Sequence, residues 1–345
     1  MKKLFGKTWV KRLFISLLSL LVIFIVLQII PPRKVILDNP FIKKEDQGVL
    51  IAAHRGGKHL NPENTFKAFD YSIENYNIDI LELDLVMTKD GHLVSIHDET
   101  INRSSDVEEI TGSSESYYVG EHTLDELLEF NFGYKFQDRD GNYPYRDIVG
   151  FDDPNRREIL KNNNLNIVTI DEIFMKYLDT DLLYIVEIKD KGETGKKAAD
   201  YLNDLLVLHN LFDRVTIGTF HDDVSKYLKD NYPKIIRGGS VGDVTGFIVT
   251  QMLGVNIFNT NNFASLQIPT SQNVGPITLR LDKLSYINRA HRRGMSVQYW
   301  TINDKEEMRH LIELGADVIM TDSPDVLYDL LVEMGFRLKK KCNGV

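Results

Sequence analysis

Cysteine is almost absent from this chain of 345 residues, in which Cys342 is the single example. A disulfide bond within the chain is therefore excluded, and so is a metal site built from several thiolates. Cys342 follows three lysines near the end of the sequence, as prenylated cysteines often do, but the next two residues, Asn343 and Gly344, are not aliphatic. We therefore interpret residues 333–345 as a basic tail.

Positive charge is also in short supply. The chain has 41 Lys and Arg residues against 50 Asp and Glu residues, which gives a formal net charge of -9. Proteins that bind nucleic acid through its phosphates need a surplus of positive charge, so we expect no nucleic-acid partner. A substrate that carries a phosphate would need a local source of positive charge, and a bound cation would supply it.

One long segment near the N-terminus has no charged residue. Residues 13–30 are apolar except for Ser16, Ser19 and Gln28. As a helix, these eighteen residues would be about 27 Å long, close to the thickness of the hydrocarbon layer of a membrane. A cleaved signal peptide is the alternative, but such peptides have a shorter apolar core followed by small residues. The run here ends in two isoleucines and two prolines, so we predict an uncleaved transmembrane helix.

The charges beside this segment predict its orientation. Residues 1–12 contain no acidic residue and five basic ones, namely Lys2, Lys3, Lys7, Lys11 and Arg12. Because basic residues concentrate on the cytoplasmic side of membrane proteins, we expect residues 1–12 in the cytoplasm. A polar linker at 31–47 and the rest of the chain are then expected on the extracytoplasmic side of the cell membrane.

Short apolar runs alternate with amphipathic stretches over residues 48–332. The expected strands are 49–53, 80–85, 93–96, 183–188, 215–219, 235–238, 255–258, 296–300 and 318–320. The expected helices include 65–76, 195–206, 224–230, 283–292 and 305–313. Such alternation is typical of an α/β fold with a parallel sheet, and this many units in one domain favours a closed TIM (β/α)8 barrel.

Two places interrupt the alternation. Asp90-Gly91 separates two strand-like runs and predicts an antiparallel hairpin. Residues 104–165 form a loop-rich insertion with a short helix expected near 124–130, and connections of this length are often lids or binding loops. If Asp90-Gly91 is a two-residue loop, then Asp84 lies opposite His97.

Acidic residues end two of the apolar strands. Glu82 and Asp84 alternate with leucines and so share one face of their strand, and Glu187 occupies a similar position in 183–188. Ion pairs with Arg or Lys would satisfy them, but three acids at strand ends also suit the mouth of a barrel, where catalytic groups gather. Their oxygen atoms favour one divalent cation, Mg²⁺ or Ca²⁺.

Basic and imidazole groups complete the candidate site. His54 ends the first strand and is followed by Arg55 and two glycines, which suggests a loop that faces a phosphate. His54 and His97 could act as an acid–base pair on a phosphodiester, while Arg55 and Lys189 stabilise charge on its oxygens. The following helix is expected to begin at Asn64 or Thr65 as its cap.

The sequence from residue 49 to about residue 331 resembles the glycerophosphodiester phosphodiesterase family of phospholipase-C-like barrels. The resemblance rests on short pieces that occur in the same order as in that family. The matching pieces are His54-Arg55-Gly56, Pro62-Glu63-Asn64-Thr65, Glu82-Leu83-Asp84, Thr88-Lys89-Asp90-Gly91, His97-Asp98, Glu187-Ile188-Lys189, Trp300-Thr301-Ile302-Asn303, Gly315-Ala316-Asp317 and Thr321-Asp322-Ser323-Pro324.

The resemblance implies a role for each of these residues. Glu82, Asp84 and Glu187 would bind the metal, and His54 and His97 would be the general acid and base. The substrate would be bound by Arg55, Glu63, Lys189 and Trp300, although Trp300 could equally be a core residue. The family splits a glycerophosphodiester into glycerol 3-phosphate and an alcohol, through a cyclic phosphate that water opens.

Two alternatives remain open from the sequence. The predicted membrane anchor suggests that the same site could act on a lysophospholipid, as a lysophospholipase D, or on a glycerophosphate polymer. A different class of protein, an inactive membrane-tethered binding protein, is disfavoured because all the expected acid, base and ligand residues are present.

Overall fold

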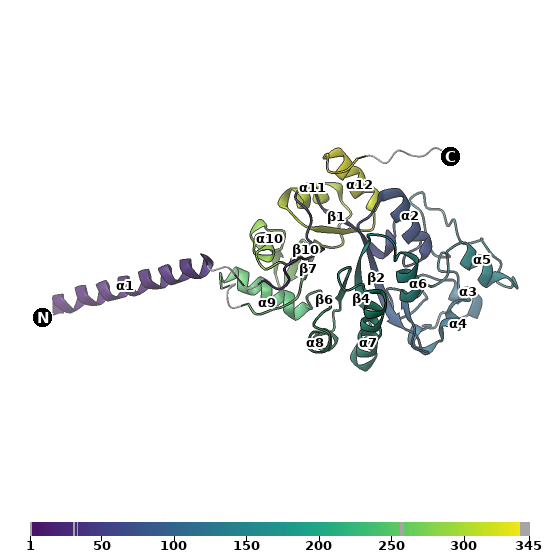
Figure 1. The fold of residues 1–345 in the computed structure, drawn as a ribbon, viewed down its shortest axis with the longest axis horizontal. Coiled ribbons are helices and arrows are strands. Elements are labelled where there is room, and N and C mark those ends of the chain that lie inside the picture. The colour runs from purple at the N-terminus through teal and green to yellow at the C-terminus, as the bar shows by residue number, and fades with distance from the viewer. Residues whose placement is uncertain (1, 30–31, 33, 256–258, 339–345) are drawn as a thin grey trace.

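The computed structural model of the chain describes residues 2–29, 32, 34–255 and 259–338. Within these residues, eight parallel strands form a barrel ringed by helices (Figure 1). The barrel strands are β1 (Leu50–Ala53), β2 (Ile80–Met87), β4 (Leu183–Ile188), β5 (Val215–Gly218), β6 (Ile236–Arg237), β7 (Ser265–Ile268), β10 (Ser296–Tyr299) and β11 (Val318–Thr321). They are ordered β6-β5-β4-β2-β1-β11-β10-β7, and a bridge between Gly238 and Ser265 joins the two ends. The predicted fold class is confirmed.

Helices cover the outside of the barrel. They are α2 (Phe66–Tyr76), α6 (Ile170–Lys176), α7 (Gly192–His209), α8 (Asp222–Asn231), α9 (Val241–Met252), α10 (Leu284–His291), α11 (Lys305–Leu314) and α12 (Pro324–Glu333). The five helices expected from the sequence correspond to α2, α7, α8, α10 and α11. The strand expected at 255–258 falls largely outside the described residues, and β7 takes the corresponding position in the barrel.

The insertion packs beside the barrel rather than within it. It contains α3 (Val107–Thr111), η2 (Val119–Glu121), α4 (Leu124–Leu127) and α5 (Arg156–Asn162). Its apolar side chains form a second core with the outer hairpin strand β3 (Leu93–Ser95), which pairs with β2. A buried ion pair between Asp106 and Arg156 holds the start of α3 to α5. The insertion is therefore folded, and it shares a core with the hairpin.

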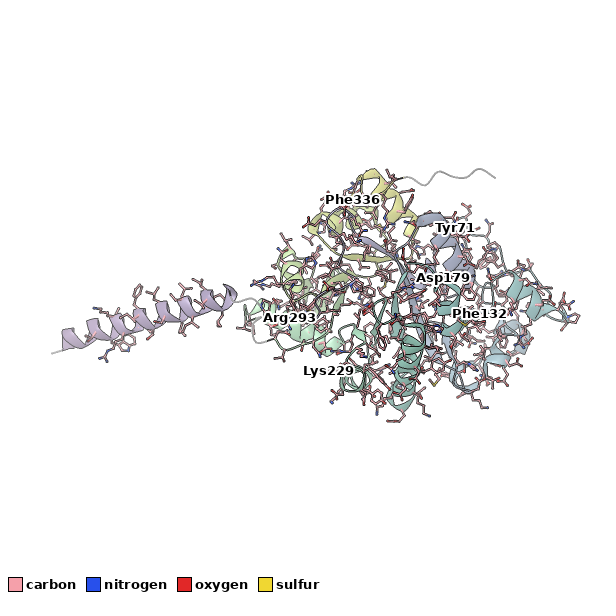
Figure 2. The ribbon with its side chains drawn as sticks, viewed as in Figure 1. Tyr71, Phe132, Asp179, Lys229, Arg293 and Phe336 are labelled. Carbon is pink, nitrogen blue, oxygen red and sulfur yellow. The ribbon has the colours of Figure 1, made fainter. Side chains whose placement is uncertain are left out.

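The N-terminal helix α1 (Lys2–Ile29) extends away from the barrel, as Figure 1 and the side-chain view in Figure 2 both show. Its residues 8–27 are long and apolar enough to cross a membrane, and none of them is buried against the barrel. A signal sequence has the same properties, so the length and composition of α1 fit a membrane span and a signal sequence alike.

The segment between α1 and β1 closes the base of the barrel. The Val35 amide donates a hydrogen bond to the Arg293 carbonyl over 2.7 Å. The Asn39 amide group donates to the carbonyls of Ala264 and Gly294, over 2.9 and 3.0 Å. Phe41 is fully buried among the first inward-facing residues of the strands. The expected polar linker is thus packed against the barrel from Val35 onward.

Replacing Phe41 should therefore destabilise the barrel. We expect Phe41→Ala to lower the free energy of unfolding by about 3–5 kcal/mol, because it leaves a cavity among the strands. Leu37→Ala, in the same segment but at a side chain that is 78% exposed, should change it by less than about 0.5 kcal/mol. Urea denaturation of the detergent-solubilised chain measures both, and equal effects would show that the segment does not seal the barrel.

Candidate active site

A strained loop at the end of β1 presents His54 and Arg55. Arg55 has a left-handed backbone with φ of 52°, which costs free energy for a residue with a side chain. Its amide donates a 2.7 Å hydrogen bond to Glu82 Oε2, which holds the loop against β2. At Gly56, also left-handed, a Cβ would lie 2.5 Å from Phe69 on α2, so only glycine fits there. The glycine allows close packing of the loop on α2.

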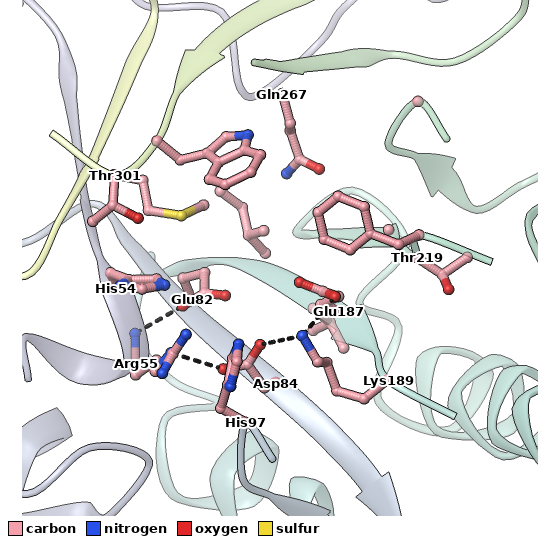
Figure 3. A pocket seen from close by; sticks show the side chains of 17 residues that line it. His54, Arg55, Glu82, Asp84, His97, Glu187, Lys189, Thr219, Gln267 and Thr301 are labelled. Carbon is pink, nitrogen blue, oxygen red and sulfur yellow. Dashed lines mark hydrogen bonds and ion pairs between the residues drawn. The ribbon is translucent and has the colours of Figure 1, made fainter. Parts of the chain in front are cut away.

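A pocket opens at the carboxyl ends of the strands, next to this loop (Figure 3). Of the nine residues predicted to form the site, eight line it: His54, Arg55, Glu82, Asp84, His97, Glu187, Lys189 and Trp300. They come from β2 and β4 and from the segments that follow β1, β3, β4 and β10. The fold thus brings together residues that are up to 246 positions apart in the chain, from His54 to Trp300. None of the described residues that line the pocket belongs to the insertion.

Three carboxylates form one side of the pocket. Glu82 and Asp84 are 3% and 1% exposed, and Asp84 is paired in register with Glu187 on the neighbouring strand. Burial raises the pKa of Glu82 well above its usual value, and the charge of Asp84 raises it further. Burial also raises the pKa of Glu187, against the opposing effect of Lys189. Together, the three carboxylates need positively charged groups close to them.

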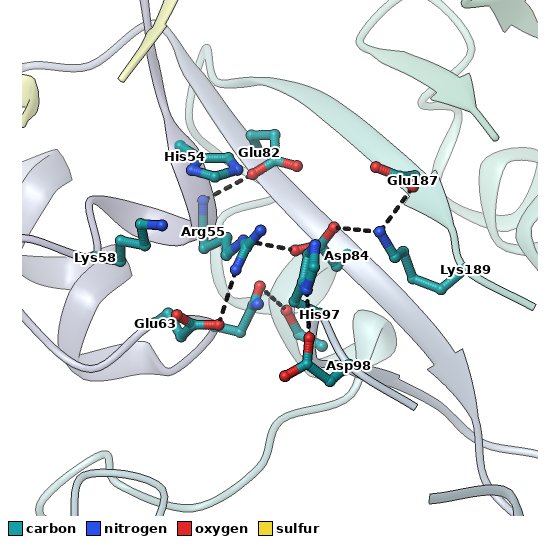
Figure 4. Close-up of polar contacts among 12 residues, drawn as sticks. His54, Arg55, Lys58, Glu63, Glu82, Asp84, His97, Asp98, Glu187 and Lys189 are labelled. Atoms are coloured by element: carbon teal, nitrogen blue, oxygen red, sulfur yellow. Dashed lines mark hydrogen bonds and ion pairs between the residues drawn. The ribbon is translucent and has the colours of Figure 1, made fainter. Parts of the chain in front are cut away.

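Two side chains supply part of this charge (Figure 4). Lys189 Nζ lies 2.9 Å from Glu187 Oε1 and 3.6 Å from Asp84 Oδ1. Arg55 Nε lies 3.1 Å from Asp84 Oδ2, but neither of these two buried atoms makes a well-aligned hydrogen bond. Leaving a buried carboxylate oxygen without a hydrogen bond costs free energy. The side chains of the site therefore do not fully compensate the negative charge of Asp84.

The carboxylates are chemically suited to a divalent cation. They are oxygen donors, they are buried, and Asp84 Oδ2 has no hydrogen-bond partner, which together match the preferences of Mg²⁺ and Ca²⁺. In the described part of the chain, however, no three His, Cys, Asp or Glu side chains already converge around a metal position. Lys189 instead lies between Asp84 and Glu187. A bound cation would have to displace its ammonium group from there.

His54 is held by a carboxylate on its far side. Its Nδ1 lies 2.5 Å from Asp322 Oδ1, while Asp322 Oδ2 accepts a 2.8 Å hydrogen bond from the Asn303 amide group. Burial alone would raise the pKa of Asp322, but its contacts with His54, Asn303 and Lys58 lower it to about 2. Asp322 is therefore ionised, and it fixes the orientation of the imidazole ring.

His97 is held in the same way by a different network. Its Nδ1 lies 2.6 Å from Asp98 Oδ1, and Arg103 Nε donates to Asp98 Oδ2 over 2.5 Å. Arg103 also forms two hydrogen bonds, of 2.7 and 3.0 Å, with the Glu63 carboxylate. Glu63, predicted to bind substrate, does not line the pocket; it accepts a 3.2 Å hydrogen bond from Arg55. Glu63 thus lies behind Arg55 and links it to the His97 network.

The predicted register of the hairpin is wrong by one residue. The observed pairs are Leu85 with Ser95, Val86 with Val94 and Met87 with Leu93, and the Ile96 amide donates to the Asp84 carbonyl over 2.9 Å. Asp84 therefore lies opposite Ile96 instead of His97. The cause is a three-residue loop, Lys89-Asp90-Gly91, in which Gly91 has a φ of 88°. His97 reaches the pocket from the segment just after β3.

Asp322 lies in one of the matching pieces of the sequence, but no role in the site was predicted for it. It immediately follows the apolar strand β11, just as Glu187 lies near the end of β4, so the rule applied to Glu187 would have selected it. The rim aromatic Phe220 was also missed; its ring makes an edge contact with Trp300, with centroids 6.1 Å apart. No pattern in the sequence marks an exposed phenylalanine of this kind.

Comparisons with known proteins agree with this geometry. A sequence profile described as the "Glycerophosphoryl diester phosphodiesterase family" matches residues 54–326. A glycerophosphodiester phosphodiesterase from Caldanaerobacter subterraneus subsp. tengcongensis is 27% identical over 83% of this chain and 99% of its own. A human lysophospholipase D is 26% identical over 81% of this chain and 85% of its own.

A solved structure is similar in fold. It is that of an Oleispira antarctica phosphodiesterase in complex with the product sn-glycerol-3-phosphate, with a TM-score of 0.56 and 18% identity over 82% of this chain and 96% of that chain. The profile itself begins at His54 and extends into α12, so it spans the whole pocket. This chain belongs to the glycerophosphoryl diester phosphodiesterase family and is a phosphodiesterase.

Proposed function

We propose that this chain hydrolyses a glycerophosphodiester to glycerol 3-phosphate and an alcohol, with His54 and His97 as general acid and base. The observation that carries the proposal is that both imidazoles line one pocket with the carboxylates, and each has its Nδ1 against an aspartate. The second ring nitrogen, Nε2, then lies on the side of the ring away from that aspartate. Two oriented imidazoles at one pocket are what proton transfer to and from a phosphodiester requires.

The first step forms a cyclic phosphate. The glycerol hydroxyl next to the phosphate attacks phosphorus, and one histidine takes the hydroxyl proton. The bond between phosphorus and the alcohol oxygen breaks, and the other histidine gives that oxygen a proton. In the second step the two histidines exchange roles: one takes a proton from the water that attacks phosphorus, and the other gives a proton to the attacking glycerol oxygen of the first step as its bond to phosphorus breaks, which releases glycerol 3-phosphate. The protons balance over the two steps.

Positive groups in the pocket hold the phosphate. Arg55 and Lys189 can donate hydrogen bonds to its oxygens and oppose its charge, which the net charge of -9 of the chain would otherwise repel. A divalent cation, Mg²⁺ or Ca²⁺, held by Glu82, Asp84 and Glu187 would supply further stabilisation of charge on the phosphoryl oxygens. The buried Asp84 Oδ2 atom, which has no hydrogen-bond partner, supports this part of the proposal.

A lysophospholipid is a second candidate substrate. The human relative is a lysophospholipase D, and the rim of the pocket carries Phe220, which is 52% exposed, beside Trp300. An exposed aromatic pair can contact the apolar part of a lipid. The head group and the reaction chemistry would be the same as in the first candidate.

A substrate panel with and without chelator tests the reaction and its cation. The full-length chain in detergent should release glycerol 3-phosphate from glycerophosphocholine, glycerophosphoethanolamine or, by the same site, lysophosphatidic acid from lysophosphatidylcholine. Addition of EDTA should abolish this turnover, because the carboxylates lose the cation that balances them, and Mg²⁺ or Ca²⁺ should restore it. His97→Ala should lower it by about 10²–10⁴-fold.

The matched control is His310→Ala, at a half-exposed histidine on α11 outside the pocket, which should keep wild-type turnover. Turnover that survives EDTA would contradict the cation, and turnover that survives His97→Ala would contradict the acid–base pair. No turnover of any member of the panel by the wild-type chain would favour a binding protein.

Asp322→Asn tests how His54 is positioned. Loss of the carboxylate should lower kcat on the order of 10²-fold and leave KM nearly unchanged, because Asp322 acts through the orientation of His54. Since the folded-state pKa of Asp322 is lowered to about 2, its carboxylate stabilises the fold above about pH 4 and loses this effect as the pH falls through about 2. The difference in unfolding free energy between wild type and Asp322→Asn should therefore shrink over that range. Asp325→Asn, which removes a surface ion pair with Arg139, is the control and should keep kcat.

The location of the enzyme is a separate proposal. The basic residues at the N-terminal end of α1 and the uncharged remainder of that helix support a membrane span with the N-terminus in the cytoplasm and the barrel on the extracytoplasmic side. Protease added to intact cells or protoplasts should then digest the barrel. Complete protection, with digestion only after lysis, would show the opposite orientation, and recovery of a soluble chain lacking α1 would show a cleaved signal sequence.

A further inference from the structure

One side of the barrel has an exposed surface without charge. On the outer face of α9, Val241, Val249, Met252 and Leu253 at its end are between 45% and 64% exposed. They are spaced so that they lie along one stripe of the helix. The single charged residue of α9 is Asp243, and its carboxylate is bonded to Arg237 at 2.5 Å. By contrast, the neighbouring helix α8 carries five charged residues in ten.

An adjacent hairpin extends this surface at the mouth of the barrel. Strands β8 (Ser271–Val274) and β9 (Ile277–Arg280) form a two-stranded sheet in the connection after β7. Val274 and Ile277, at its tip, are 61% and 66% exposed. Because the hairpin follows the carboxyl end of β7, it lies at the end of the barrel where the pocket opens.

The same sector of the chain is basic. Residues 238–300 contain five Lys or Arg residues against two Asp or Glu residues, a local charge of +3 in a chain of net charge -9. The basic residues are Arg280 (paired with Asp282), Lys283, Arg289, Arg292 and the buried Arg293. An apolar surface within a basic sector is the pattern by which peripheral proteins contact anionic lipid.

The attachment point of α1 lies beside this sector. Val35 is bonded to Arg293, next to α10, and Arg289 of α10 donates a 2.8 Å hydrogen bond to the Gln251 carbonyl of α9. Figure 1 shows α9 and α10 on the side of the barrel that α1 joins, and Figure 2 labels Arg293 there. Five residues, 30–34, separate Ile29 from Val35, so these two positions lie at most about 20 Å apart. A bilayer that held α1 would therefore lie close to α9.

We propose that α9 and the tip of the β8–β9 hairpin form a bilayer-contact surface, which holds the barrel on its side with the mouth of the pocket at the level of the lipid head groups. The contact rests on the membrane location proposed above for α1, and its consequence rests on the proposed reaction: a glycerophosphodiester head group on a lysolipid in the same bilayer reaches the pocket without leaving the membrane. The exposed Phe220, in the loop after β5, belongs to the same side of the mouth as the loops after β6 and β7.

Lipid quenching tests the contact itself. In a Cys342→Ser background, an environment-sensitive fluorophore would be attached to Met252→Cys on α9, and the full chain reconstituted in phosphatidylcholine–phosphatidylglycerol vesicles with nitroxide-labelled lipid. The probe should be quenched several-fold more than one on Leu208→Cys of α7, which is also apolar and exposed but lies on another helix. Equal quenching at the two positions would overturn the proposal. A decrease in quenching of the Met252 probe as the density of protein in the membrane rises would also overturn the proposal, because it would show that a second copy covers α9.

Turnover tests the consequence for substrate. Met252→Glu with Leu253→Glu should lower turnover of lysophosphatidylcholine in the vesicles several-fold and leave turnover of soluble glycerophosphocholine unchanged. An equal loss for both substrates would point to misfolding, and the quenching comparison then decides the contact. Unchanged turnover of the vesicle substrate would overturn the consequence for substrate access. If the wild-type chain acts on neither substrate, the proposed function fails, whereas the quenching result still stands or falls on its own.

Discussion

Asp84 is buried between Arg55 and Lys189, and the charges around it determine how the neighbouring loops are held. Two like charges about 4 Å apart repel by about 4 kcal/mol at the effective dielectric of a protein surface, and more when buried. Glu82, Asp84 and Glu187 can therefore lie together only where cations oppose them. The left-handed backbone of Arg55 follows from this constraint, because it presents the amide to Glu82 and the guanidinium to Asp84. The strained loop after β1 is thus held by the carboxylates of β2.

The same constraint extends from the pocket to the second histidine. Acidic and basic groups alternate through successive contacts, in the order Asp98, Arg103, Glu63, Arg55, Asp84, Lys189 and Glu187. His97 is attached at one end of this series through Asp98. Any group that changes the charge at Asp84, such as a phosphate or a cation, will change the partners available to Arg55 and Lys189. Glu63 then matters as the link that keeps Arg55 in place while its other contacts change.

Much of the barrel and of the site could be predicted from the sequence, because barrel strands and the acids at their ends leave local sequence patterns. The acids at Glu82, Asp84 and Glu187 and the hairpin around Gly91 were predicted on that basis. The hairpin register was not, since Asp-Gly suits both a two-residue loop and a three-residue loop with glycine in the left-handed region. Strand β7 was missed because its four residues include Ser265 and Gln267 and resemble a loop. The contact of Asp322 with His54 joins positions 268 residues apart, and no local pattern reports it.

The packing at the base of the barrel also could not be predicted from local sequence patterns, and it determines how α1 is attached. Asn39 and Phe41 have no periodicity that marks a buried segment, yet Phe41 fills the space where the first residues of the strands meet. The chain that leads from α1 is consequently part of the barrel from Val35 onward, and only five residues lie between α1 and that point. If α1 spans a membrane as proposed, a barrel on so short a tether cannot turn freely above the bilayer, and its resting orientation depends on which side interacts best with lipid. Among the described helices around the attachment point, α9 has the uncharged outer face that such an orientation requires.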